Sequence, residues 1–385
     1  MTTIQYIDTP EQLDALCQLI ATAPWIALDT EFLREKTYYP KFCLLQIATP
    51  DWVACIDPIA LTDLNPLLDV LYLPSIIKIF HSCRQDLEIF FQLRGSIPQP
   101  IFDTQLAAPL LGFQDNTGYA MLVSSFLNIN LNKAYTRTDW SVRPLIPEQI
   151  DYAADDVIYL CKIYQIMCKQ LSDLGRLDWL NADFEQLDNS ELYQLSPENA
   201  WFKIKGKNKL TGKQLSIIQT LSAWREEIAQ QENRPRNWLI RDELLIELAK
   251  LQPENIDALA GVRGIHEKTV SRYGKVLCQL ITDAKQRPPI PLNEKDKSAK
   301  KTPEQEAILD LLAALVRLRA DQNRLNPSIL ATRKDLEDLL DDQPDGALLQ
   351  GWRRAMVGNE LTALLQGRSV LSINPKTIQL LSSAD

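Results

Sequence analysis

The chain has 385 residues, of which 45% are hydrophobic and 24% charged, so it can bury more than one hydrophobic core. Its formal net charge of -9 excludes a surface that binds polyanions everywhere, so any contact with nucleic acid must be local. No apolar run is long enough to span a membrane, no basic residue precedes Arg34, and the seven cysteines contain no C-x-x-C pair. We therefore expect a cytoplasmic protein with reduced cysteines that does not bind membranes.

Residues 25–57 contain three β-rich runs, WIALDTEF, FCLLQIA and WVACID, which are separated by short loops. Their spacing predicts an antiparallel meander that opens a sheet. A strand at 75–81, a helix at 84–93 and a strand at 101–104 follow, and this alternation predicts a mixed sheet flanked by helices. We expect this α/β domain to occupy residues 1–195.

Two irregular stretches divide the remainder of the chain. The first is the lysine-rich WFKIKGKNKLTGK at 201–213, and the second is a proline-rich, charged stretch at 286–303. Between and after them the apolar residues recur with a helical period. The pattern predicts two all-α bundles, over 206–286 and 303–385, with helices that continue to residue 381. We interpret the second bundle as a diverged copy of the first.

Two acidic residues lie on one face of the first long strand. Because side chains alternate along a strand, Asp29 and Glu31 in WIALDTEF project from the same side. Two close carboxylates repel each other and are costly to bury unless a cation lies between them. Oxygen ligands favour Mg²⁺ or Mn²⁺, whereas zinc would prefer His and Cys, and the chain has only two histidines, His81 and His266. The alternative is an exposed edge strand with two solvated acids.

Further acids occur at the starts of two predicted helices. Asp86 opens the helix after the strand SIIKIFH, where its alternative role is that of an ordinary cap or dipole partner. In YAADDVIYL, Tyr152 and Asp156 are four residues apart and share a helix face, while Asp155 is turned about 100° away. We therefore pair Tyr152 with Asp156, although this spacing alone is common on helices.

Three stretches carry a family resemblance: ALDTEF, HSCRQDLEIF and TRTDWSVRPLIPEQIDYAADDVIYL. Together they resemble, in order, the three exonuclease motifs of ribonuclease D, within the D-E-D-D superfamily of 3′ to 5′ exonucleases. The resemblance covers roughly residues 1 to 180, and the first helical bundle resembles the HRDC module of ribonuclease D and RecQ-type helicases. It implies an RNase H-like exonuclease domain followed by two HRDC-like bundles.

The resemblance also implies a site and a reaction. Asp29, Glu31, Asp86 and Asp156 match the four metal-binding acids, and Tyr152 matches the tyrosine that distinguishes one branch of the superfamily. Two divalent ions, Mg²⁺ or Mn²⁺, would support hydrolysis of RNA from a free 3′ end to nucleoside 5′-monophosphates. The expected substrates are precursor tRNA and other small RNAs, and the expected state is a monomer. A DNA exonuclease and a catalytically silent RNA-binding scaffold are the alternatives.

Basic and aromatic residues outside the acids are candidates for RNA contact. The loop REKTYYPKF mixes both kinds, although core or turn packing explains it equally well, and the lysine-rich stretch is equally compatible with a solvated linker. The predicted substrate-binding residues are Gln46, His81, Tyr38, Arg137, Arg143, Lys203, Lys205 and Lys207.

Overall fold

The computed structural model describes residues 3–132, 135, 138–291, 301–344 and 346–382. The chain divides into two compact units. The first comprises Met1–Glu31, Cys43–Asn189 and Lys300–Asp385, and the second comprises Phe32–Phe42 and Ser190–Ala299. The predicted domain limits of 1–195, 206–286 and 303–385 remain a prediction.

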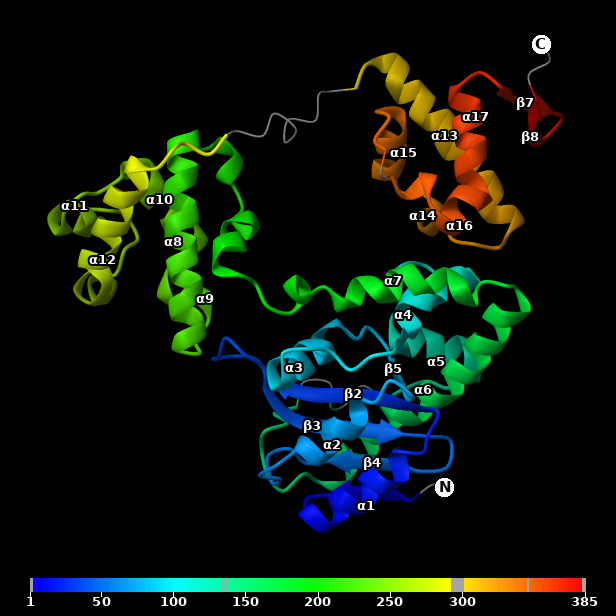
Figure 1. Ribbon diagram of the computed structural model, residues 1–385, viewed down its shortest axis with the longest axis horizontal. Coiled ribbons are helices and arrows are strands. Elements are labelled where there is room, and N and C mark those ends of the chain that lie inside the picture. The colour runs from blue at the N-terminus through cyan, green and yellow to red at the C-terminus, as the bar shows by residue number, and fades with distance from the viewer. Residues whose placement is uncertain (1–2, 133–134, 136–137, 292–300, 345, 383–385) are drawn as a thin grey trace. The chain divides into compact units, whose positions relative to one another are not determined.

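A six-stranded mixed sheet forms the centre of the first unit (Figure 1). Its strands are β1 (Ile4–Ile7), β2 (Trp25–Leu33), β3 (Lys41–Ala48), β4 (Val53–Ile56), β5 (Ile77–Phe80) and β6 (Ile101–Asp103). Their order is β1-β4-β3-β2-β5-β6, with β3 and β4 antiparallel and with parallel pairs β1–β4, β2–β5 and β5–β6. The mixed α/β fold predicted from the sequence is therefore confirmed.

Helices cover this sheet because their apolar residues recur on one face. They are α1 (Pro10–Ile20), α2 (Asn65–Leu71), α3 (Arg84–Arg94), α4 (Thr104–Ala107), α5 (Tyr119–Leu127), α6 (Pro147–Asp173) and α7 (Asn181–Glu185). The longest, α6, starts with Pro147 at a position where the missing N–H costs nothing. It buries Ala153, Val157 and Leu160, which lie on the same side of the helix.

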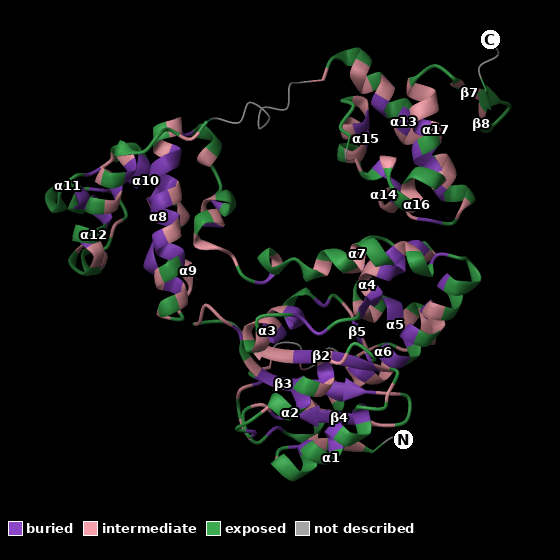
Figure 2. Cartoon of the chain, in the orientation of Figure 1, coloured by how far each residue is buried: buried purple, intermediate pink, exposed green. Residues whose placement is uncertain are grey.

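The second unit is a helical bundle around α8. Its helices are α8 (Gly212–Gln231), α9 (Arg236–Leu239), α10 (Asp242–Leu251), α11 (Ile256–Ala260) and α12 (Glu267–Gln286). The Thr211 hydroxyl caps α8 by accepting a hydrogen bond from the Gln214 N–H, and the Gln214 side-chain oxygen accepts one from the Thr211 N–H. Figure 2 shows α8 buried along much of its length, in agreement with the fully buried Ile217, Ile218 and Leu221.

The C-terminal residues of the first unit also form a helical bundle. Its helices are α13 (Pro303–Gln322), α14 (Pro327–Leu330), α15 (Arg333–Leu340), α16 (Gly351–Arg353) and α17 (Asn359–Leu365). Trp352 of this bundle stacks on Trp179, with ring centroids 4.5 Å apart, and the Asn323 carbonyl accepts a 2.6 Å hydrogen bond from the guanidinium of Arg176. The described residues also contain short 3-10 or π segments: Ala108–Leu111, Leu177–Leu180, Gln186–Asp188, Ser190–Leu192, Pro197–Lys203, Lys207–Lys209, Ala347–Leu349 and Arg354–Gly358.

One element differs from the sequence prediction. The helices were expected to continue to residue 381, but α17 ends at Leu365 and an antiparallel hairpin follows, β7 (Ser369–Asn374) and β8 (Thr377–Ser382). Both strands contain β-branched residues, Val370 and Ile373 in β7 and Thr377 and Ile378 in β8, and such residues favour strand over helix. Between the paired Asn374 and Thr377, Lys376 adopts a left-handed φ of 69°, which turns the chain back. Within the described residues, no helix is long and apolar enough to cross a membrane.

Candidate active site

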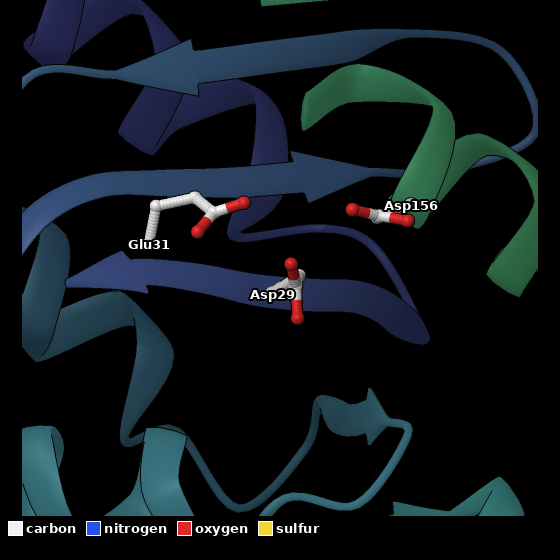
Figure 3. A group of neighbouring side chains, drawn as sticks. All are labelled: Asp29, Glu31 and Asp156. Atoms are coloured by element: carbon white, nitrogen blue, oxygen red, sulfur yellow. The ribbon is translucent and has the colours of Figure 1, made fainter. Parts of the chain in front are cut away.

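Three carboxylates from two distant segments converge at the centre of the first unit. Asp29 and Glu31 come from β2, and Asp156 comes from α6. Each offers an oxygen atom within 4.8 Å of the others, and Figure 3 shows the three side chains facing a common space. The strand alternation thus places Asp29 and Glu31 as predicted, and the helix supplies the third acid.

The backbone around these acids is held by specific contacts. On β2, the neighbouring Leu28 and Thr30 point to the opposite, buried side of the strand. On α6, the hydroxyl of Tyr119 donates to the backbone carbonyl of Asp156 and so fixes the helical turn that carries this acid. Tyr119 could not be predicted from local sequence patterns, because its role depends on a contact with a residue 37 positions further along the chain.

The electrostatics of the site favour a bound cation. Burial and then the charge of Asp156 raise the pKa of Glu31 to about 8, and burial followed by the charge of Asp155 raises that of Asp156 to about 7. Burial and then Asp86 raise the pKa of Asp29 well above its usual value. Each shift reports that the ionised form is disfavoured, and a divalent cation would offset this penalty. The all-oxygen donor set fits Mg²⁺ or Mn²⁺.

Asp86, the fourth predicted acid, is not among the carboxylates whose oxygen atoms lie within 4.8 Å of one another. It is in the first turn of α3 and only 6% exposed, and one of its oxygens accepts a hydrogen bond from the Thr30 hydroxyl. Its charge contributes to the raised pKa values of both Asp29 and Glu31, so the four acids form one electrostatic group. Burial raises the pKa of Asp86 itself to about 7, although the hydrogen bond from Thr30 opposes the shift.

Tyr152 lies one helical turn before Asp156, as the spacing predicts. Its ring is stacked on Trp140, with centroids 6.2 Å apart, and meets the edge of Tyr135 at 5.9 Å. These aromatic neighbours restrict the ring to one side of α6. The phenol is therefore attached to the same rigid helix as the third acid.

His81 and Asp103 surround the turn that leads into α3. The Nδ1 atom of His81 lies 3.0 Å from the hydroxyl of Thr104, and its ring centroid is 5.4 Å from that of Tyr119. The Asp103 carboxylate accepts bonds from the N–H groups of Ser82 and Cys83, at 3.0 and 2.8 Å. Through these bonds Asp103 stabilises the turn before α3. His81 contacts Tyr119, whose hydroxyl bonds the Asp156 carbonyl.

Arg143, predicted to contact RNA phosphates, has a structural role instead. Its five N–H donors make five hydrogen bonds within the protein: two to Asp57, at 2.6 and 2.7 Å, and one each to the carbonyls of Cys43, Trp140 and Val142. Asp57 is 2% exposed and also accepts a 2.6 Å bond from the Tyr6 hydroxyl. Since a guanidinium has only five donors, none is left for a phosphate. We therefore do not retain Arg143 as a substrate-binding residue.

Two further candidates for RNA contact, Gln46 and Tyr38, are buried or already hydrogen-bonded within the protein. Gln46 is fully buried within β3, and neither polar atom of its side-chain amide has a hydrogen-bond partner among the described residues. The hydroxyl of Tyr38 donates to Glu226 and accepts a 3.2 Å bond from the side chain of Gln230. We therefore do not retain Tyr38 as a substrate contact, whereas the assignment of Gln46 stays a prediction.

The lysine-rich stretch is more accessible. Lys203 and Lys205 are exposed, and the adjacent Phe202 is 57% exposed. Lys207 donates a 2.6 Å hydrogen bond to the Phe202 carbonyl. Arg137 lies outside the described residues.

Comparisons with known proteins agree with this arrangement. Residues 4–172 match a family model described as a 3′-5′ exonuclease, and residues 214–281 match that of the HRDC domain. The chain is 38% identical over 384 residues to ribonuclease D of Granulibacter bethesdensis, covering 98% of this chain and 96% of that protein. It is 37% identical to ribonuclease D of Pseudomonas paraeruginosa, covering 94% and 98% respectively.

A solved structure supports the same assignment over nearly the full length. Escherichia coli RNase D, an exoribonuclease involved in structured RNA processing, superposes with a TM-score of 0.82 at 31% identity, covering 95% of this chain and 99% of that one. The catalytic core of RRP6 from Trypanosoma brucei, at 24% identity, covers 74% and 80% with a TM-score of 0.56 and shares the fold. This chain belongs to the ribonuclease D family and is a 3′ to 5′ exoribonuclease of that type.

Proposed function

We propose that this exoribonuclease depends on two divalent cations and matures the 3′ ends of precursor tRNA and other small RNAs, releasing nucleoside 5′-monophosphates. The observation that carries the metal dependence is the convergence of three carboxylates from β2 and α6 within 4.8 Å. The tRNA substrate is supported by the similarity to a ribonuclease D that processes structured RNA.

Four acids of this chain would hold the cations: Asp29, Glu31, Asp86 and Asp156. When bound, the two ions supply a nucleophilic water and stabilise the negative charge on the leaving 3′ oxygen. The carboxylates fix where the scissile phosphate must lie, because their backbones belong to a central strand and a long helix. A phenol has an unperturbed pKa near 10, so Tyr152 is a poor base at neutral pH and we assign it to orienting the attacking water.

Replacing Tyr152 with phenylalanine should lower the rate of the chemical step by about 100-fold, because the water loses its orientation while the acids remain. The measurement is single-turnover hydrolysis of a short RNA, together with Mn²⁺ affinity, which should not change. Tyr159→Phe, on the same helix, is the matched control and should hydrolyse RNA at the normal rate. An unchanged single-turnover rate for Tyr152→Phe would rule out the orienting role.

The second unit offers surfaces suited to holding RNA. Lys203 and Lys205 stand exposed next to Phe202, which combines charges for phosphates with a ring for stacking. A cavity of about 600 Å³ elsewhere in this unit is lined by Arg241, Arg263 and Trp238, the last of which is 55% exposed. We assign both surfaces to binding the RNA body away from the reacting phosphate.

Lys203→Ala combined with Lys205→Ala should reduce the salt dependence of RNA binding. Each single-strand phosphate contact contributes about 0.7 to the slope of log affinity against log salt, so the slope should flatten by about 1.4. Binding to a catalytically inactive variant across a series of salt concentrations measures this slope. The control is Lys275→Ala with Lys334→Ala, which removes two exposed lysines elsewhere. An equal slope for both double variants would contradict the assignment.

A 3′-extended precursor tRNA tests the proposed reaction directly. With Mg²⁺ or Mn²⁺, the 5′-labelled RNA should shorten stepwise, while the 3′-labelled RNA should release labelled mononucleotide from the outset. A circular RNA of the same sequence, which has no 3′ end, should remain intact. Internal fragments from the 3′-labelled RNA would contradict the proposal. Parallel reactions on matched DNA decide between the RNA enzyme and the alternative DNA exonuclease, because only contacts with the 2′-hydroxyl separate the two.

A further inference from the structure

The segment that leads into α6 contains Arg143 and the buried Trp140, and it forms a tight turn. The carboxylate of Asp139 accepts hydrogen bonds from the N–H and the hydroxyl of Ser141, at 3.0 and 2.7 Å. The sequence suggested that this segment contacts RNA, but every donor of Arg143 is used within the protein. The turn and its arginine therefore require another explanation.

Arg143 attaches this turn to the central sheet. Its guanidinium donates two bonds to Asp57, the residue that follows β4, and one 2.6 Å bond to the Cys43 carbonyl in β3. Asp57 is itself held by a hydrogen bond from the Tyr6 hydroxyl of β1. Another nitrogen of the same guanidinium donates a 2.7 Å bond to the Trp140 carbonyl. One planar group thus fixes the backbone of Trp140 relative to the sheet.

The Trp140 side chain packs against the phenol of Tyr152. The two rings are stacked, with an interplanar angle of 28° and centroids 6.2 Å apart. Trp140 is 3% exposed, so its indole is too buried to bind RNA itself. This contact comes from a residue that precedes α6, which starts at Pro147. The ring of Tyr152 is therefore bounded by a group outside its own helix.

The helix alone does not determine where the Tyr152 hydroxyl lies. α6 fixes the backbone of Tyr152 one turn before Asp156, but a helical side chain still has more than one χ1 rotamer available. A ring packed against one side of the phenol excludes a rotamer that would occupy the same space. Because a water can be oriented only by a hydroxyl in the correct place, this packing bears directly on the reaction.

We propose that Trp140 is a positioning residue, which the Arg143–Asp57 pair holds against Tyr152 so that the phenol points to the attacking water. This inference rests on the proposed role of Tyr152 in orienting that water. It gives the Arg143–Asp57 pair a consequence for the reaction rate besides its contribution to stability. A displacement of about 1 Å can slow a reaction by about 100-fold, so a partial loss of packing should slow it by about tenfold.

Trp140→Leu tests the proposal in the full-length protein. Leucine keeps the position apolar but removes the stacked ring. In single-turnover hydrolysis of a short RNA, the rate at saturating RNA should fall about tenfold. The RNA concentration for half-saturation and the Mn²⁺ affinity should not change, because Trp140 is buried and is not one of the four acids. Trp140→Phe keeps an aromatic ring and should recover at least about half of the lost rate.

A second background separates positioning from general damage to the fold. Tyr152→Phe lacks the hydroxyl, so adding Trp140→Leu to it should change the rate by less than about twofold. Damage to the fold would instead slow both backgrounds equally. All rates are measured well below the melting temperature of each variant.

Arg143→Lys tests the attachment of Trp140 to the sheet. Lysine keeps a positive charge beside Asp57, but an ammonium group lacks the planar fork that also reaches the Trp140 carbonyl. The single-turnover rate should fall at least about threefold when Tyr152 is present. In the Tyr152→Phe background the same substitution should change the rate by less than about twofold.

Trp179→Leu is the matched control, because Trp179 is also stacked on an aromatic ring, that of Trp352, with centroids 4.5 Å apart. Its single-turnover rate should equal that of wild type. Equal slowing by Trp140→Leu in both backgrounds, or a normal rate when Tyr152 is present, would overturn the positioning role and leave the role of Tyr152 intact. An unchanged rate for Tyr152→Phe alone would instead overturn the proposed role of Tyr152, and this inference with it.

Discussion

Replacing Asp156 with asparagine should reduce RNA hydrolysis by about 1,000-fold, which is the scale of loss when a charge-stabilising group is removed from an active site. Asparagine keeps the shape of the side chain, so the fold and RNA binding should survive. The rate of nucleotide release from a 5′-labelled RNA under single-turnover conditions measures the effect. Asp155→Asn, at the next position of α6 but outside the three converging carboxylates, is the control and should remain active.

The same substitution should stabilise the metal-free protein at alkaline pH. The folded-state pKa of Asp156, about 7, exceeds the unfolded value of about 4. Its contribution to stability is therefore fully present below pH ~4 and is lost as the pH rises through about 7. Asparagine has no such loss, so the melting temperature of the variant should exceed that of wild type at pH 8 and not at pH 5.

The rate prediction has its own contradicting outcome. If Asp156→Asn hydrolyses RNA at a rate within about tenfold of wild type, Asp156 does not belong to the catalytic group.

Replacing Arg143 with alanine should lower the free energy of unfolding by about 3 to 5 kcal/mol, the cost of leaving a buried charge without its partner. Asp57 would keep the hydrogen bond from Tyr6 but lose two bonds from the guanidinium. Urea unfolding at neutral pH measures the loss. Asp57→Asn in the Arg143→Ala background removes the unpaired buried charge and should recover part of the lost free energy of unfolding.

The Arg143–Asp57 pair also predicts an acid dependence. Although burial opposes it, hydrogen bonds from Arg143 and Tyr6 lower the Asp57 pKa to about 2. The stabilisation is present above the unfolded pKa of about 4 and disappears as the pH falls towards 2. A loss below about 1 kcal/mol in Arg143→Ala, with weakened RNA binding, would return Arg143 to the RNA-binding surface.

The directions of the candidate metal-binding carboxylates could be predicted from the sequence, because local periodicity determines them. Strand alternation places Asp29 and Glu31 on one face, and the helical repeat relates Tyr152 to Asp156. That β2 and α6 lie together required the family resemblance, since no local pattern states which helix covers which strand. The order of the motifs along the chain supplied this information.

The roles of Arg143 and Tyr38 could not be read locally. Each was a plausible RNA contact by residue type, but its true partner lies far away: Asp57 is 86 residues from Arg143, and Glu226 is 188 residues from Tyr38. A basic or aromatic residue looks the same in sequence whether its partner is a phosphate or a buried carboxylate. The hairpin β7–β8 was missed for a different reason, because short apolar runs such as those in SVLSIN and TIQLLS fit a helix or a strand equally well.

Equilibrium titration of the metal-free enzyme with Mn²⁺, followed by electron paramagnetic resonance or calorimetry, tests the metal site most directly. The wild-type protein should bind two ions per chain and release protons on binding, since the carboxylates must ionise. Asp29→Asn and Asp156→Asn should each bind fewer ions or bind them more weakly. Full RNA hydrolysis in excess chelator, or Mn²⁺ binding that neither substitution alters, would contradict the account.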